Sequence, residues 1–222
     1  MEKNDFLISC DAVGSMHFPR WQELPEFELY MDQVIALAEK YLSVLTPDHK
    51  VPITPSMINN YVKSGALPPP KNKKYNREHL ALLMIICSMK SVMEISSISD
   101  IVRQSILSSS IESVLDTFAE MYESSVSAAA KKARLAVSAS SSDHIFSSIA
   151  IENALRASAA RTVAMYAYSM IETKTEASEE EKEKTKAEKK AEKKAEKAER
   201  KAEKAKEEEM KENKEISEET KS

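Results

Sequence analysis

Apolar residues recur every three or four positions along most of the first 172 residues, and this is the spacing of one face of a helix. The first such run starts after Pro25, which suits the first turn of a helix, and continues to Leu45. The sequence Thr46-Pro47-Asp48 should end this helix, because proline cannot continue it. Residues 1–24 show no clear period, and we expect them to form an irregular N-terminal segment.

A second, shorter helix is predicted to begin at Thr54-Pro55, where a hydroxyl can cap the first turn and proline can occupy it. Gly65 should end it, because glycine readily adopts the left-handed conformation that stops helices. The pair Ile58/Val62 indicates one buried face. The outward face is polar and consists of Ser56, Asn59, Asn60 and Lys63.

Three consecutive prolines, residues 68–70, then force an extended segment, and Asn76 can cap the next helix. That helix contains residues 80–87, which are apolar on all sides and therefore predict a central, enclosed helix. Another helix should follow, capped by Ser96 or Ser97.

Two longer helices are predicted for residues 111–137 and 146–171, separated by a break at 138–143. Both are rich in Ala and Ser, which lets helices approach closely, so we expect a helical hairpin. Hairpins from two chains would form a four-helix bundle, and we therefore expect a homodimer. The apolar stripe of the second helix consists of Phe146, Ile149, Asn153, Ala157, Ala160, Ala164, Tyr168 and Ile171.

The last fifty residues are a low-complexity sequence of Ala, Glu and Lys, with 16 basic and 17 acidic side chains in residues 173–222. These residue types favour helix, but the four-residue repeat places like charges one turn apart, which is unfavourable. We expect a solvated tail that is partly helical or disordered. An Ala-lined coiled coil and a specific interaction tail are the alternatives.

No combination of side chains predicts catalysis or a metal site. The four histidines are scattered, and only the weak pair Cys10/His17 resembles a ligand pair. His79, at a helix start, is expected to be a surface residue. Only two cysteines are present, and no apolar run is long enough for a signal peptide or a membrane span. We expect a cytoplasmic protein that is not an enzyme, carries no cofactor and does not contact a membrane.

One stretch is strongly basic in an otherwise acidic chain whose formal net charge is −4. Between Asp48 and Glu78 no acidic residue occurs. Clusters of this kind bind nucleic-acid backbones, because each neutralised phosphate releases counterions. Asparagine on a neighbouring helix can bond adenine in the major groove. The alternative is a solvated loop. The basic residues are Lys50, Lys63, Lys71, Lys73, Lys74 and Arg77.

The same stretch, "INNYVKSGALPPPKNKKYNREHLALLMIICSMKSVMEISSISDIV", resembles the MerR-type helix-turn-helix. The matching residues, in order, are Tyr61, Gly65, Leu67, Pro68, Tyr75, Leu80, Leu83, Ile86, Ile95 and Ile98. The wing of the MerR pattern is shortened here to residues 69–75 and has no glycine. Roughly residues 20–170 are also similar to an uncharacterised family of small proteins from low-GC Gram-positive bacteria that is expected to be MerR-like.

The helical periodicity predicts an all-α fold, and the resemblance makes residues 25–108 a helix-turn-helix-like domain. The helical hairpin at 109–172, a candidate for dimerisation, and the tail at 173–222 are predicted from the residues themselves, and the tail lies outside the resemblance. The basic stretch and the MerR-type order of residues together predict a DNA-binding transcriptional regulator with double-stranded DNA as its partner, whereas the uncharacterised family by itself implies a fold and no defined role. Lys71, Lys73, Lys74 and Arg77 would hold phosphates, and Asn59, Asn60 and Lys63 would approach base edges. The alternative is a non-enzymatic adaptor that binds another protein through its C-terminal helices.

Overall fold

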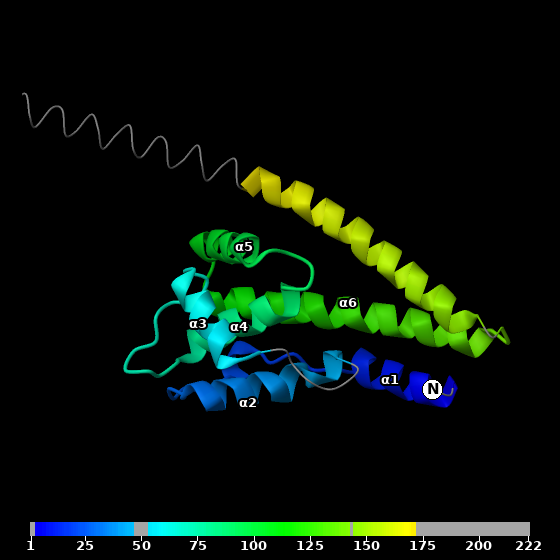
Figure 1. Ribbon diagram of the computed structural model, residues 1–222, viewed down its shortest axis with the longest axis horizontal. Coiled ribbons are helices and arrows are strands. Elements are labelled where there is room, and N and C mark those ends of the chain that lie inside the picture. The colour runs from blue at the N-terminus through cyan, green and yellow to red at the C-terminus, as the bar shows by residue number, and fades with distance from the viewer. Residues whose placement is uncertain (1–2, 47–52, 143, 172–222) are drawn as a thin grey trace, which may run out of the picture. The chain divides into compact units, whose positions relative to one another are not determined.

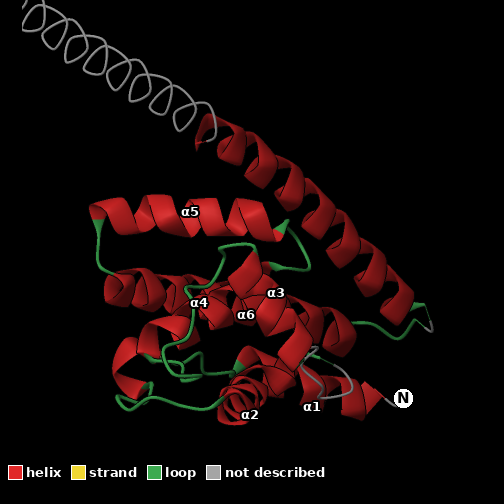
Figure 2. Ribbon diagram, turned by 60° about the vertical axis from the view of Figure 1, so that its left-hand side comes forward, coloured by secondary structure: helices red, strands yellow, loops and turns green. Residues whose placement is uncertain are grey.

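The computed structural model describes residues 3–46, 53–142 and 144–171, so the predictions for the tail at 173–222 and for Lys50 lie outside the described residues. All regular secondary structure in the described part is helical, as predicted (Figure 2). The helices are α1 (Lys3–Gly14), α2 (Met31–Leu42), α3 (Pro55–Lys63), α4 (Arg77–Met89), α5 (Ile95–Ser108), α6 (Ile111–Ala139) and an unlabelled C-terminal helix, residues 145–171. Short 3-10 turns occur at Trp21–Glu23 and Ser43–Leu45.

Helix α4 lies at the centre of the fold, with α2, α5 and α6 packed against it (Figure 1). Leu80, Leu83 and Ile85 are at most 2% exposed, which confirms the prediction of an enclosed helix. Leu115 of α6 is also fully buried and belongs to the same core. The predicted regions 25–108 and 109–172 therefore share one core, within a compact unit that ends at Ile171.

The N-terminal segment is not irregular, in contrast to the prediction, because residues 3–14 form α1 along α6 (Figure 1). The contact depends on small residues. A β-carbon added to Gly14 would lie 3.1 Å from the β-carbon of Ala130, so glycine lets the two helices approach closely. Phe6 packs edge-to-face on Phe146, with ring centroids 5.2 Å apart.

Helix α2 begins at Met31 rather than at Pro25. The residues before it are extended, because Leu29 forms an antiparallel bridge with Tyr75. Both backbone hydrogen bonds of this bridge measure 2.8 Å. The preceding segment is tied to α6 by Glu123, whose carboxylate accepts hydrogen bonds from the Phe18 N–H and the Arg20 guanidinium.

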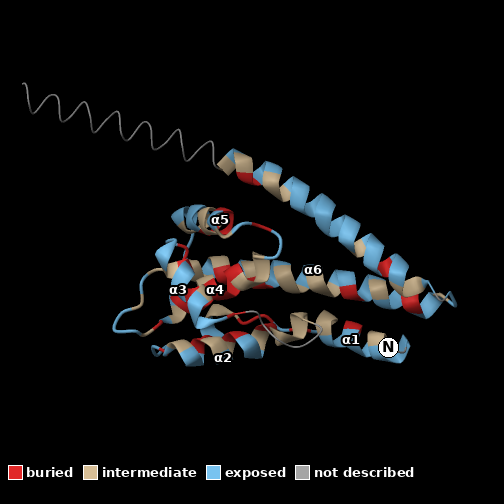
Figure 3. Cartoon of the chain, viewed as in Figure 1, coloured by how far each residue is buried: buried red, intermediate tan, exposed pale blue. Residues whose placement is uncertain are grey.

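The cap of α5 also differs from the prediction, since its N-cap residue is Glu94 and not Ser96 or Ser97. Helix α6 and the helix of residues 145–171 form the predicted hairpin (Figure 1). In the predicted stripe of the second helix, Ile149 and Tyr168 are buried, while Ala157 and Ala160 are exposed. The helix is therefore packed near its two ends and exposed along its middle (Figure 3).

Candidate nucleic-acid interface

Helix α3 presents its polar face to solvent, as predicted. The Thr54 hydroxyl caps it by accepting a hydrogen bond from the Met57 N–H at 3.3 Å. Ile58 and Tyr61 are buried, and these two side chains fix the helix on the core. Asn59, Asn60 and Lys63 are all exposed. Their amides and ammonium group are thus available for contact with a partner.

The shortened wing forms a tight turn. The backbone N–H of Lys74 donates to the carbonyl of Lys71 at 2.9 Å, and these residues form an antiparallel bridge. The two residues between them, Asn72 and Lys73, have φ values of 51° and 61°. Two central residues with positive φ define a type I′ turn, the connection that suits the twist of paired strands. Asparagine tolerates this conformation, whereas lysine is strained in it.

The turn points its lysines outward. Lys71 and Lys73 are exposed, and Lys74 is half-buried with its Nζ 5.6 Å from the centroid of the Tyr30 ring. This is the geometry of a cation–π contact. Among the described residues, no acidic side chain forms an ion pair with these three lysines or with Lys63. Their positive charge is therefore not neutralised locally.

Arg77 is not part of this exposed group, in contrast to its predicted role as a phosphate ligand. Its side chain is only 14% exposed, and its Nη2 forms an ion pair with Glu26 at 3.2 Å. Its guanidinium lies 5.3 Å from the Trp21 ring centroid. Arg77 thus holds the start of α4 against the N-terminal segment, and we leave it out of the interface.

Asn59 and Lys73 line one hollow of about 920 Å³ between α3, the start of α2 and the turn. Tyr30 lines the same hollow and is half-exposed, so an aromatic ring stands beside the amide and the ammonium group. Asp32 also contributes, and its carboxylate reduces the positive potential there. The sequence predicted no role for Tyr30, because its apolar spacing assigned it to the interior of a helix.

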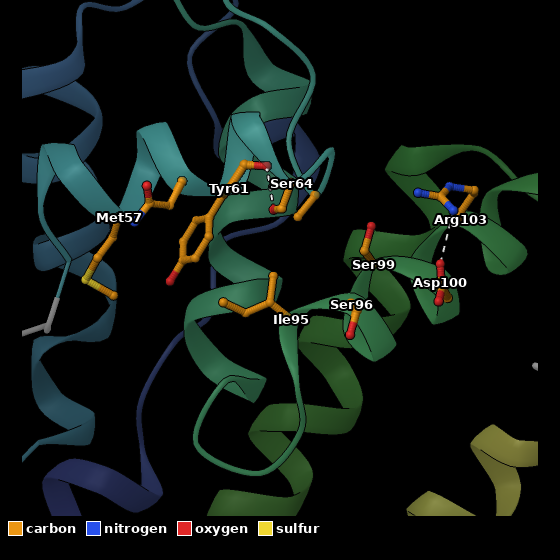
Figure 4. Close-up of a pocket in the computed structure, with 10 residues that line it drawn as sticks. Met57, Tyr61, Ser64, Ile95, Ser96, Ser99, Asp100 and Arg103 are labelled. Atoms are coloured by element: carbon orange, nitrogen blue, oxygen red, sulfur yellow. Dashed lines mark hydrogen bonds and ion pairs between the residues drawn. The ribbon is translucent and has the colours of Figure 1, made fainter.

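Asn60 lines a different hollow, of about 630 Å³, between α3 and α5. Figure 4 shows this hollow, with Met57 and Tyr61 of α3 on one side and Ser99 and Arg103 of α5 on the other. The two amides were predicted to act side by side, but they face different surfaces, because neighbouring residues on a helix point about 100° apart. Tyr61 lines this second hollow, and its buried hydroxyl has no hydrogen-bond partner among the described residues. On the opposite side, Arg103 forms an ion pair with Asp100 at 3.0 Å.

The remaining candidate groups are structural. His79, expected on the surface, is buried, and its imidazole and the Asn76 side chain cap α4 by accepting each other's backbone N–H groups. Burial raises the pKa of the Cys87 thiol to about 11, so the thiol is protonated at neutral pH. In residues 3–46, 53–142 and 144–171, no group of three His, Cys, Asp or Glu side chains is placed to hold a metal ion. Within the same ranges, no helix has the length and hydrophobicity needed to span a bilayer.

Residues 19–125 match a family model described as "Domain of unknown function (DUF1836)". The match covers the N-terminal segment from Pro19, α2 to α5 and the first half of α6, and thus includes the whole candidate interface. No curated protein and no solved structure matches the chain. The segment from Pro19 to Ser125 is therefore similar to a family that is itself uncharacterised, as the sequence predicted, but the match ends at residue 125 and not near residue 170.

Proposed function

We propose that this protein binds double-stranded DNA through α3 and the lysine turn, and that it acts as a transcriptional regulator of MerR-like type. The observation that carries the proposal is the shared position of Asn59 and Lys73 on one hollow, beside lysines that lack acidic partners in the described part of the chain. Lysines without partners can neutralise phosphates, and an exposed amide can reach a base edge.

Each side chain of the interface has a distinct role in this proposal. Lys71, Lys73 and Lys74 contact phosphates, which position the protein but carry no sequence information. Asn59 contacts a base edge, supported by Lys63 on the next turn of α3. Tyr30 packs beside them against the sugar-phosphate backbone. Asn60 lies at the edge of this surface and contributes less than Asn59.

The test is a salt titration of binding to a mixed-sequence duplex, followed by fluorescence anisotropy. A variant with Lys71, Lys73 and Lys74 changed to Ala should bind more weakly to every sequence. The slope of log affinity against log salt should become shallower by about 0.9 for each phosphate that the variant no longer neutralises. Circular dichroism of the variant checks that the helices persist.

Lys193, Lys197 and Lys201 provide a matched control, because changing them to Ala removes the same charge from the tail. Affinity and slope should then change little. An equal loss of affinity in both variants would mean that positive charge acts without regard to position, and it would contradict the proposal. Once a preferred sequence is known, Asn59→Ala should reduce discrimination at one base pair by about 1–3 kcal/mol and leave the salt slope unchanged.

A protein-interaction adaptor is the second candidate. It is favoured by large apolar side chains on the C-terminal helix that are exposed to solvent, among them Leu155 and Tyr166. If the parent protein binds no duplex even at low salt, the DNA proposal fails and the adaptor function takes its place.

A further inference from the structure

The helix of residues 145–171 is apolar on two faces that point in roughly opposite directions. Ile149 and Tyr168, on one face, are buried against the rest of the chain. Ile151, Leu155, Val163 and Tyr166 lie on the other face and are 61–72% exposed. A single chain covers the first face and leaves the second in water. The sequence-based stripe identified only the face that is buried at its ends.

These exposed residues, together with Ala159, form a continuous line that we call the outer stripe. Successive members lie three or four residues apart and therefore follow one side of the helix. The middle of the stripe is small, since Ser158 and Ala159 lie between the bulky ends. Small side chains at the centre allow a second helix to approach closely. The exposed middle of the helix is visible in Figure 3.

Two bulky residues of the outer stripe, Leu155 and Tyr166, exchange places when the stripe is reversed. Consider a two-fold axis that crosses the helix between residues 160 and 161, with a second copy running antiparallel. Leu155 then faces Tyr166 of the second copy, and Tyr166 faces its Leu155. By the same operation, Ser158 faces Val163. Every pair therefore occurs twice, as a symmetric dimer interface requires.

Charge near the axis does not oppose this pairing. Arg161 is the charged residue closest to the axis, but its Nε donates to the backbone carbonyl of Val92 at 2.8 Å. This hydrogen bond directs the guanidinium toward the body of its own chain and away from the outer stripe. Glu152 forms ion pairs with Arg156 on the same helix and with Lys132 of α6, so each of these three charged groups has an opposite charge beside it.

We propose that a second copy of this chain covers the outer stripe through antiparallel pairing of the two helices of residues 145–171. The tail of the same chain is a poor alternative, because its only large apolar residues are Met210 and Ile216. The proposal does not depend on DNA binding, and it is tested without DNA.

The test compares molar masses by light scattering for the full-length chain at tens of micromolar. The parent should have twice the chain mass. Leu155→Glu should give a monomer, because it places two carboxylates in the apolar seam. Adding Tyr166→Lys to this variant should restore the dimer, because each glutamate then faces a lysine of the other copy. Only antiparallel pairing in the proposed register produces this rescue.

The matched control is Leu107→Glu on α5, which changes an equally exposed leucine (76% exposed) outside the stripe and should leave the dimer intact. A monomeric parent, a double variant that remains monomeric, or dissociation of the Leu107→Glu variant would each overturn the proposal.

A second measurement uses disulfide formation. A variant carrying Leu155→Cys and Tyr166→Cys should become covalently dimeric under mild oxidation, whereas Leu155→Cys alone should not. Cys10 and Cys87 should not interfere, because burial raises the pKa of both thiols. Covalent dimerisation of the Leu155→Cys variant to the same extent would indicate parallel or unspecific pairing and would overturn the proposed register.

Discussion

Changing Glu123 to alanine should destabilise the chain by about 2–4 kcal/mol. Its carboxylate accepts hydrogen bonds from the Phe18 N–H at 2.7 Å and from the Arg20 Nη1 and Nη2 atoms at 3.0 and 2.7 Å. Hydrogen bonds to a charged group contribute about 1.5–3 kcal/mol each, and a buried N–H without its partner costs about 1–3 kcal/mol.

These contributions do not add fully. The Arg20 side chain is 28% exposed, so water can hydrate part of the guanidinium once the carboxylate is gone. Phe18 is fully buried, and its N–H has no such access. The expected loss of stability is therefore close to that of one buried N–H plus part of one charged pair, which gives the range stated above.

Urea unfolding measures this loss. Trp21, the only tryptophan, lies in the segment that Glu123 holds, so its fluorescence reports on the segment, while circular dichroism reports on the helices. The midpoint should fall and the slope should remain unchanged. Glu123→Gln should lose less stability, because the amide oxygen can still accept from Phe18. Glu120→Ala, one turn earlier on α6 and exposed, is the control and should change stability by less than about 0.5 kcal/mol.

A loss below about 1 kcal/mol in Glu123→Ala would refute this reasoning. The segment would then be held mainly by aromatic packing. Phe18 contacts the rings of Phe118 and Tyr122, with centroids 5.3 and 5.5 Å apart, and these contacts would account for the remaining stability.

Two further predictions concern the turn and pH. Lys73→Gly should stabilise the chain by about 0.5–1 kcal/mol in the same urea assay, because glycine adopts a φ of 61° without strain. Lys71 is not in this strained conformation, so Lys71→Gly should give no gain in stability. A gain in both variants would contradict the explanation. Hydrogen bonds from Arg20 hold the pKa of Glu123 below its ordinary value. The contribution of Glu123 to stability is therefore complete above about pH 4.3 and is lost as the pH falls through the lowered folded-state pKa. Urea midpoints at several pH values should show this loss in the parent and a smaller loss in Glu123→Gln.

The helices with strong periods could be predicted from the sequence, and those formed by tertiary contacts could not. The apolar run in α4 allows only a buried helix, and Thr54-Pro55 signals the start of α3. Helix α1 was not predicted because its close approach to α6 occurs at Gly14 and its buried residue is Cys10, so its sequence shows no apolar face.

The exposure of most side chains of the candidate interface could be predicted from their polarity, but the partners that they contact could not. The polar residues of α3 and Lys71 and Lys73 of the turn are exposed because amide and ammonium groups are costly to bury without partners. The inward position of Arg77 depends on Trp21 and Glu26, which lie far away in sequence, and no local pattern reveals such partners. The position of Tyr30 beside the turn was missed for the same reason, since it follows from the bridge between Leu29 and Tyr75.

The two proposals make DNA binding by an acidic chain physically reasonable. The net charge of the chain does not decide DNA binding when basic and acidic residues lie on different parts of the surface, because salt screens the field of each charge beyond about 10 Å at moderate ionic strength. The lysine turn and α3 form a locally basic surface of this kind, although the carboxylate of Asp32 reduces its positive potential. A two-fold dimer would present this surface twice and double the number of phosphates neutralised, so the salt dependence would be steeper than one turn can produce. A Leu155→Glu variant separates the two effects: with the turn intact and the dimer dissociated, binding should persist with about half the parent slope. Unchanged binding and slope in a monomeric variant would show that one copy is sufficient for DNA binding and that dimerisation does not contribute to it.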